Sequence, residues 1–174
     1  MKQPQPLTSG KSGALTGTIR IPGDKSMSHR ALMFGLLAKE ETMISGLLEG
    51  EDVLDTANAV RHLGGRVKDG RDGLWRVFGL GPGKIHEPET VLDMGNSGTS
   101  TRLLMGLVAG HPISATFAGD ASLTRRPMKR VIDPLTQMGA QFLGRKNGRL
   151  PLTMRGTGEI KPITYETPVA SAQV

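Results

Sequence analysis

The sequence predicts an α/β fold that is built from a repeated β-α-β-α-β-β unit. Two observations support this prediction. The stretch SHRALM at residues 28–33 opens an apolar helical segment, and a similar stretch, STRLLM, opens another one 72 residues later. After each segment, strand-like and helix-like patterns follow in the same order. The chain therefore repeats an organisation and not just a short motif.

The first unit is expected at residues 18–90, after a lead-in of residues 1–17. Its elements are recognised by alternating or helical apolar spacing and by glycines that end a helix or turn a hairpin. In order, they are a strand at 18–21, a helix from 28 to near Ala38, a strand at 42–47, an amphipathic helix from Asp52 to Gly64-Gly65, and a hairpin of 66–67 with 74–78.

The second unit is expected at residues 91–158 and follows the same order. Its second helix is predicted by an apolar stripe at helical spacing, and its hairpin by an Asn-Gly turn. In order, the elements are a helix from 100 to near Ala109, a strand at 113–117, a helix with Val131, Ile132, Leu135 and Met138 inward and Gly139 at its end, and a hairpin of 141–143 with 150–154 around Asn147-Gly148.

A third unit is expected to start at residues 159–174, with a strand at 160–165 and the segment SAQV, which begins 71 residues after Ser100. The chain ends where the next buried helix would begin, which would leave the preceding strands without cover. We therefore expect an N-terminal fragment or one half of a split protein. A natural two-unit domain with a frayed tail is the alternative.

Composition limits the classes of function. Hydrophobic residues make up 37% of the chain, no stretch approaches the roughly 18 apolar residues of a membrane span, and the first ten residues lack the apolar core of a secretion signal. With no cysteine for disulfides, a cytoplasmic protein without a membrane partner is expected. A net charge of +6 suits an anionic partner, but few aromatic residues and scattered basic residues argue against nucleic acid.

Two strand-to-helix junctions carry the residue types that bind anions. Gly23-Asp24-Lys25-Ser26 precedes Arg30, and Gly95-Asn96-Ser97-Gly98-Thr99 precedes Arg102. Backbone N–H groups and the positive end of the helix dipole at such a junction favour phosphate or carboxylate. Ordinary N-caps and turn glycines are the alternative, which explains the serines but not the cations.

A further cationic site is Arg125-Arg126 before Pro127, where an arginine can offer a planar fork to an anion; a solvated charge pair is the alternative. The four histidines show no metal-ligand spacing, and the chain has no complete nucleotide-binding signature. No metal or cofactor is therefore expected. The remaining candidates for chemistry are carboxylates that we interpret as caps or structural partners: Asp24, Glu49, Asp52 and Asp120.

Four motifs occur in a characteristic order: PGDKSMSHR, GNSGTSTR, GDASLTRRPM and PVASAQV. With them, residues 15–174 resemble the enolpyruvyl transferase family, in the branch that acts on shikimate 3-phosphate in the shikimate pathway. The sequence of the segment LLEGEDVLDTANAV is similar to that of the bacterial class that tolerates the inhibitor glyphosate. The resemblance implies an inside-out α/β barrel type, in which two domains of three units each close over shikimate 3-phosphate and phosphoenolpyruvate. This chain would hold two units of the first domain and the start of the third.

The resemblance also implies roles for residues at the first junction and at the carboxyl end. Lys25 would clamp both substrates, and Ser26 and Arg30 would bind shikimate 3-phosphate. Ser171 would lie near the shikimate phosphate, and Gln173 near both substrates.

At the second junction, the resemblance places Gly98 and Arg126 at phosphoenolpyruvate and gives Arg102 a supporting role. A glycine lets the backbone approach a small ligand closely. Members of the tolerant class often have alanine at the position of Gly98, so this glycine argues against tolerance of glyphosate.

The implied reaction transfers the enolpyruvyl group of phosphoenolpyruvate to the 5-hydroxyl of shikimate 3-phosphate and releases phosphate. It needs cations and an acid/base pair. The resemblance places the acid/base groups in a second domain, so the isolated chain is expected to bind anions weakly without turnover. Three alternatives stay open: a docking half for a separate C-terminal polypeptide, an enolpyruvyl transferase acting on a UDP-amino sugar, which typically carries a cysteine, and a basic nucleic-acid binder.

Overall fold

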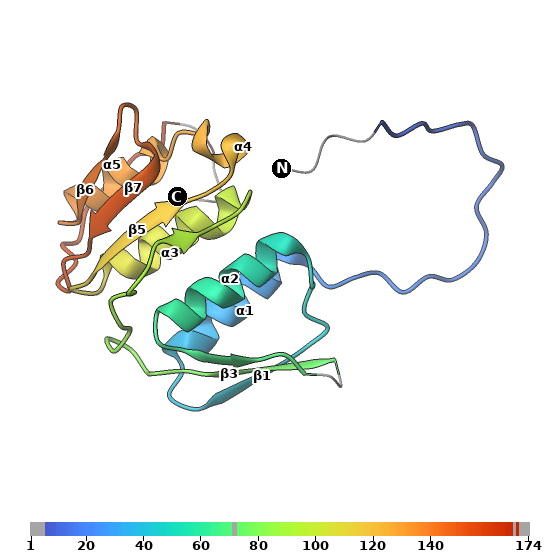
Figure 1. The fold of residues 1–174 in the computed structure, drawn as a ribbon, viewed down its shortest axis with the longest axis horizontal. Helices are drawn as coiled ribbons and strands as arrows, with labels where there is room; N and C mark the ends of the chain where they lie inside the picture. Colours follow the sequence, from blue (N-terminus) through green and yellow to red (C-terminus); the bar gives the residue numbers. More distant parts are fainter. Residues whose placement is uncertain (1–5, 71–72, 169, 171–174) are drawn as a thin grey trace.

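The computed structural model of the chain describes residues 6–70, 73–168 and 170. Two sheets lie side by side, each with helices packed on it, and residues 6–22 form a long arm that extends away from them (Figure 1). No helix in the described ranges is long and apolar enough to cross a membrane.

The first unit is a three-stranded sheet that is covered by two helices. The strand order is β1-β3-β2, and both pairings are antiparallel. Acidic residues in the first turn of the second helix and basic residues in its last turn match the helix dipole. The elements are α1 (Lys25–Leu37), β1 (Glu41–Ser45), α2 (Glu51–His62), β2 (Arg66–Lys68) and β3 (Leu74–Phe78).

The second unit has a four-stranded sheet in the order β4-β5-β7-β6, in which β4 and β5 are parallel and the other pairs antiparallel. The predicted helix and hairpin are present, and a short helix precedes the longer one. The elements are β4 (Leu92–Asp93), α3 (Gly98–Ala109), β5 (Ser114–Ala118), α4 (Ala121–Thr124), α5 (Lys129–Gln137), β6 (Gln141–Arg145) and β7 (Arg149–Arg155).

Two predicted strands are wrong. Residues 18–21 form no strand, and the side chains of Ile19 and Ile21 are 84% and 76% exposed. Residues 160–165 form no strand either; instead they cross the second unit, where Ile163 and Tyr165 face α3 and α5. A strand needs a neighbouring strand to pair with its N–H and C=O groups, and neither segment pairs with one within the described part of the chain. The N–H of Lys161 instead donates to the carbonyl oxygen of Met138 at 3.0 Å.

The repeat is also present in backbone contacts. A Cβ atom at Gly79 would overlap the carbonyl oxygens at the end of α1, including that of Ala38. A Cβ atom at Gly156 would overlap the carbonyl oxygens at the end of α3, including that of His111. Each glycine follows the last strand of its unit, so the same contact closes both units.

A second pair of contacts recurs at the start of each first helix. A Cβ atom at Gly23, just before α1, would overlap the carbonyl oxygen of Gly46, just after β1. In the second unit the roles are exchanged, and a Cβ atom at Gly119, after β5, would lie 2.8 Å from the carbonyl oxygen of Gly95, before α3. In both units, the loop before the helix and the loop after the next strand therefore cross at a glycine.

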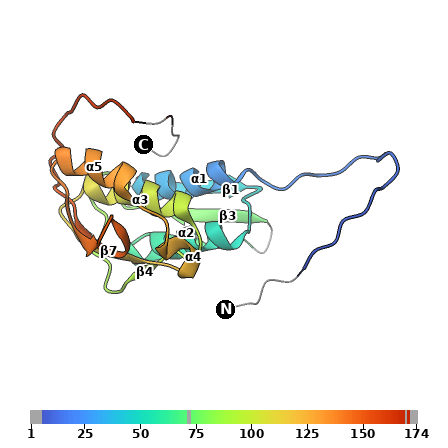
Figure 2. The same ribbon diagram turned by 90° about the horizontal axis from the view of Figure 1, so that it is seen from above.

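One hydrophobic core joins the two units. Leu32 and Leu36 on α1 and Leu104 and Val108 on α3 are fully buried, and the two helices pack against each other. Helices α1 and α3 begin towards the same end of the molecule, with α4 beside the start of α3 (Figures 1 and 2). The core thereby brings the two predicted anion-binding junctions to one end.

Asp55 lies at the junction of the two units. Its carboxylate lies against Gly95, where a Cβ atom would overlap Asp55 Oδ2. Gly95 also has a φ of +50°, a conformation that favours glycine. Burial raises the pKa of Asp55, and the negative charges of Asp93, Asp52 and Glu51 raise it further. The folded state therefore binds the proton of Asp55 more tightly than the unfolded state does, and the ionised carboxylate costs stability at neutral pH.

We expect Asp55→Asn to stabilise the chain at neutral pH, because the amide resembles the protonated acid. The gain should shrink as the pH falls through the raised pKa of the folded state towards the ordinary value of 3.8, since the wild-type carboxyl group then becomes neutral as well. Urea unfolding at a series of pH values measures both effects. A gain that does not change with pH would contradict this explanation.

We expect Gly79→Ala and Gly156→Ala each to cost about 2 kcal/mol or more in the free energy of unfolding, because the added methyl group meets backbone carbonyls that cannot turn away. Gly106→Ala is the matched control, since nothing lies within 4 Å of a Cβ atom at this exposed helical position. It should stabilise by up to about 1 kcal/mol. Thermal and urea unfolding of the three variants compare these effects.

Candidate functional site

The first junction presents a lysine that is held by a neighbouring helix. Asp24 caps α1 by accepting a hydrogen bond from the N–H of Met27 at 2.7 Å, and Lys25 begins the helix. The ammonium group of Lys25 pairs with Asp52 Oδ2 on α2 at 3.1 Å. Because the side chain of Lys25 is 52% exposed, its ammonium group stays accessible to a ligand.

Ser26 and Arg30 lie on the same helix as Lys25. Ser26 is half-buried in the first turn, and Arg30 is exposed one turn further on. Arg30 lines a groove between α1 and α3, opposite Leu103 and Leu107. The predicted shikimate-phosphate residues are thus placed along one helix start, with Arg30 facing the second unit.

At the second junction, the structure brings together three of the predicted site residues, Gly98, Arg102 and Arg126. Gly98 is the buried first residue of α3, after Ser97, whose hydroxyl accepts a hydrogen bond from the N–H of Ser100 at 3.3 Å. A Cβ atom at Gly98 would lie 2.8 Å from Arg102 Nη1 and 3.2 Å from Arg126 Nη1. The absence of a side chain at Gly98 is therefore what lets both guanidinium groups approach the helix start.

Arg102 is buried and bonded to backbone oxygens. Its Nη1 donates to the carbonyl of Gly98 at 2.9 Å and its Nη2 to that of Pro127 at 3.2 Å. Burial lowers the pKa of Arg102, and the positive charges of Arg130 and Arg126 add to this effect. A buried cation with cationic neighbours produces a positive potential that attracts anions.

Arg126 is oriented by a relay of hydrogen bonds. Asp120 caps α4 through the N–H of Leu123 and accepts from Asn96 Nδ2 at 2.7 Å; Asn96 Oδ1 then accepts from Arg126 Nη2 at 2.7 Å. Hydrogen bonding from Leu123, then from Asn96, lowers the pKa of Asp120, so its carboxylate stays ionised. The ionised carboxylate fixes the amide of Asn96 with its oxygen towards Arg126.

The relay and the Lys25–Asp52 pair were missed by the sequence reasoning. The only available signal for the relay was the Asn-Ser-Gly segment itself, since Asn96 and Arg126 are 30 residues apart. The four carboxylates that we interpret as caps or structural partners all have such contacts: Asp24 and Asp120 cap helices, and Glu49 accepts a hydrogen bond from Trp75 Nε1 at 2.9 Å. The fourth, Asp52, is the partner of Lys25.

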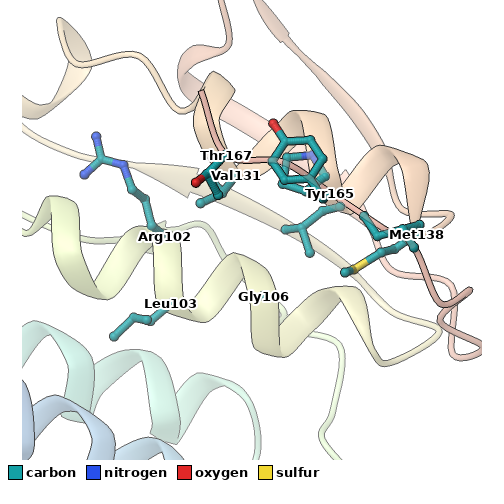
Figure 3. A pocket seen from close by; sticks show the side chains of 10 residues that line it. Arg102, Leu103, Gly106, Val131, Met138, Tyr165 and Thr167 are labelled. Carbon is teal, nitrogen blue, oxygen red and sulfur yellow. The ribbon is translucent and has the colours of Figure 1, made fainter. Parts of the chain in front are cut away.

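An apolar cavity with a volume of about 480 Å³ lies next to this site. Helices α3 and α5 form its floor, and Tyr165 and Thr167 lie over it (Figure 3). Arg102 marks one end of the cavity, and its guanidinium group points away from the apolar residues (Figure 3). The cationic cluster therefore adjoins the apolar cavity at Arg102.

Two predicted site residues, Ser171 and Gln173, lie outside the described residues. Within the described residues, no group of three or more histidine, aspartate or glutamate side chains is placed to hold a metal ion. The described site is thus a set of cations and helix N-termini, which can bind and polarise phosphate or carboxylate groups.

Known proteins resemble this chain over most of its length. The family model of EPSP synthase (3-phosphoshikimate 1-carboxyvinyltransferase) matches residues 10–174. The chain is 64% identical over 168 residues to the 3-phosphoshikimate 1-carboxyvinyltransferase of Parvibaculum lavamentivorans, and 61% identical over 163 residues to that of Novosphingobium aromaticivorans. These matches cover 97% and 94% of this chain but 37% of each relative.

The structure of EPSP synthase from Acinetobacter baumannii superposes with a TM-score of 0.85 at 42% identity. The match covers 90% of this chain and 36% of that one. The family and the α/β fold class that the motifs implied are thereby confirmed. The chain belongs to the EPSP synthase family.

Proposed function

We propose that this chain supplies the anion-binding part of an enolpyruvyl transfer site. Lys25, Ser26 and Arg30 would bind shikimate 3-phosphate, and Gly98 and Arg126 would bind phosphoenolpyruvate. The observation that carries the proposal is the convergence of Arg102 and Arg126 on the side-chain-free start of α3. The shared core of α1 and α3 supports it, since it brings both helix starts to one end.

The arrangement suits the groups that the reaction must handle. A guanidinium fork such as that of Arg126 matches a planar carboxylate, while an ammonium such as that of Lys25 binds phosphate oxygens as a point charge. In the proposed reaction, the 5-hydroxyl oxygen of shikimate 3-phosphate bonds to C2 of phosphoenolpyruvate while a proton adds to C3 and the hydroxyl proton is removed. Phosphate then leaves C2 of the tetrahedral intermediate as C3 loses a proton, which restores the double bond. The cations at the two junctions stabilise the negative charge that develops on the reacting groups.

Proton transfer needs further groups. At this end of the molecule, Asp52 is bonded to Lys25, and Asp24 and Asp120 accept hydrogen bonds from helix N–H groups. We therefore propose that the acid and base lie on a complementary C-terminal polypeptide. Ser171 and Gln173 would extend the site from this chain, and the assembled enzyme would act in the cytoplasm.

Docking to that complementary polypeptide is the second part of the proposal. The arm of residues 6–22 leaves Leu7, Leu15 and Ile19 largely exposed, at 96%, 92% and 84%. Apolar side chains at this exposure favour association with another surface.

Phosphate release from shikimate 3-phosphate and phosphoenolpyruvate tests the proposal. The chain is assayed alone and after mixing with the part of the Acinetobacter baumannii EPSP synthase that it does not match. We expect no release by the chain alone and release after mixing. Turnover by the chain alone would contradict the proposal that the acid and base lie on another polypeptide. If both samples are silent, calorimetric titration with shikimate 3-phosphate decides, and a lack of binding overturns the proposed site.

Gly98→Ala tests the phosphoenolpyruvate position. The added methyl group would displace Arg102 Nη1 and Arg126 Nη1, so we expect phosphoenolpyruvate to bind about tenfold more weakly. Glyphosate, which also carries a carboxylate and a phosphorus-centred anion, should lose affinity at the same position. Shikimate 3-phosphate binding should change little. The matched control is Gly106→Ala on the same helix, and equal losses for both substrates would contradict the assignment.

A further inference from the structure

Two side-chain pairs join α1 to α2 at the same spacing. Lys25 and His29 lie one turn apart on α1, and Asp52 and Thr56 lie one turn apart on α2. Lys25 Nζ pairs with Asp52 Oδ2 at 3.1 Å, and His29 Nδ1 lies 2.8 Å from Thr56 Oγ1. The outer pair is exposed, whereas His29 and Thr56 are fully buried.

The direction of the inner hydrogen bond follows from the number of protons. The hydroxyl of Thr56 has one proton and donates it to the backbone oxygen of Asp52 at 3.0 Å. When that proton stays in the bond to Asp52, the oxygen accepts the bond from His29, and the imidazole proton is then on Nδ1. Nε2 is then an acceptor without a partner among the described residues.

The surroundings keep His29 neutral. Burial lowers its pKa, the negative charge of Asp52 opposes this effect and the positive charge of Lys25 adds to it. A second ring proton would place an N–H group where the described structure offers no acceptor. His29 is therefore a fixed donor, and its donation reaches the backbone of Asp52 through Thr56.

We propose that His29, acting through Thr56, is a positioning residue for Lys25. An exposed ion pair alone holds a long lysine side chain weakly, because water and lost side-chain entropy offset most of its attraction. The buried bond one turn deeper fixes the offset between the two helices, so Asp52 stays opposite Lys25. The inference rests on the proposed function in one respect, the use of Lys25 as a substrate clamp.

Matched variants separate this role from simple packing. Thr56→Val keeps the shape and removes the hydroxyl, whereas Thr56→Ser keeps the hydroxyl. His29→Asn keeps a donor near the place of Nδ1, whereas His29→Gln moves the donor to the place of Nε2. Asp52→Asn, which weakens the outer pair directly, shows how far Lys25 can be released. Thermal unfolding of each variant establishes that it is folded.

The first readout needs no ligand. The full chain is treated briefly with acetic anhydride, and acetylation of Lys25 is followed by mass spectrometry, with exposed Lys84 as internal reference. We expect Asp52→Asn, Thr56→Val and His29→Gln to raise the rate at Lys25 about twofold to fivefold, the range that release from an exposed ion pair allows. Thr56→Ser and His29→Asn should stay near the wild-type rate. A wild-type rate in folded Thr56→Val or in Asp52→Asn overturns the proposal, and if Thr56→Val does not fold, equal rates in His29→Gln and His29→Asn overturn it.

Two further readouts complete the test. The ¹⁵N spectrum of the histidine rings should show neutral His29 protonated at Nδ1 and its pKa lowered from the ordinary value, and protonation at Nε2 overturns the proposal. Calorimetric titration with shikimate 3-phosphate should show about threefold weaker binding in Thr56→Val than in Thr56→Ser. If the acetylation results are as expected but the wild-type chain does not bind shikimate 3-phosphate, the proposed function fails while the positioning of Lys25 stands.

Discussion

Close contact between glycine and backbone carbonyls is the constraint on which the rest of the structure depends. In both units, a glycine after the last strand lies against the end of the first helix, at Gly79 and Gly156. At the other end of that helix, glycines cross at Gly23 with Gly46 and at Gly95 with Gly119. Each first helix is thus located at both ends by main-chain contacts, which set where its N–H groups point before any side chain contributes.

The cations of the site are held in three different ways. Lys25 has a carboxylate partner on the next helix, Arg102 donates to two backbone oxygens, and Arg126 is oriented by the amide of Asn96. The last two arrangements hold a guanidinium without neutralising its charge, because carbonyl and amide oxygens are neutral. At the second junction the carboxylate of Asp120 reaches Arg126 only through the neutral amide of Asn96, whereas at the first junction Asp52 contacts the cation directly. The direct donors of the second junction thus stay free of carboxylate contact, which suits a ligand as small and as highly charged as phosphoenolpyruvate.

The sequence predicts much of this fold, and the failures have a physical cause. Helices and hairpins depend on contacts that are close along the chain, so apolar spacing and the Asn147-Gly148 turn are sufficient to predict them. The segments at 18–21 and 160–165 have strand-like composition, but a strand also requires a neighbour, which local sequence does not reveal. The same limit applies to the site. Motifs identify Gly98 and Arg126, whereas the partnership of Lys25 with Asp52 depends on how two helices pack.

The ion pair between Lys25 and Asp52 has a consequence for selectivity. The carboxylate of Asp52 takes one of the three N–H donors of the ammonium group, so an incoming anion can share the lysine with Asp52 and need not displace it. Because the carboxylate offsets part of the positive charge, a singly charged ion such as chloride gains little there, whereas a phosphate dianion offers a larger attraction and several acceptor oxygens. The ion pair thereby holds the lysine in place and favours ligands of higher charge over monovalent salts.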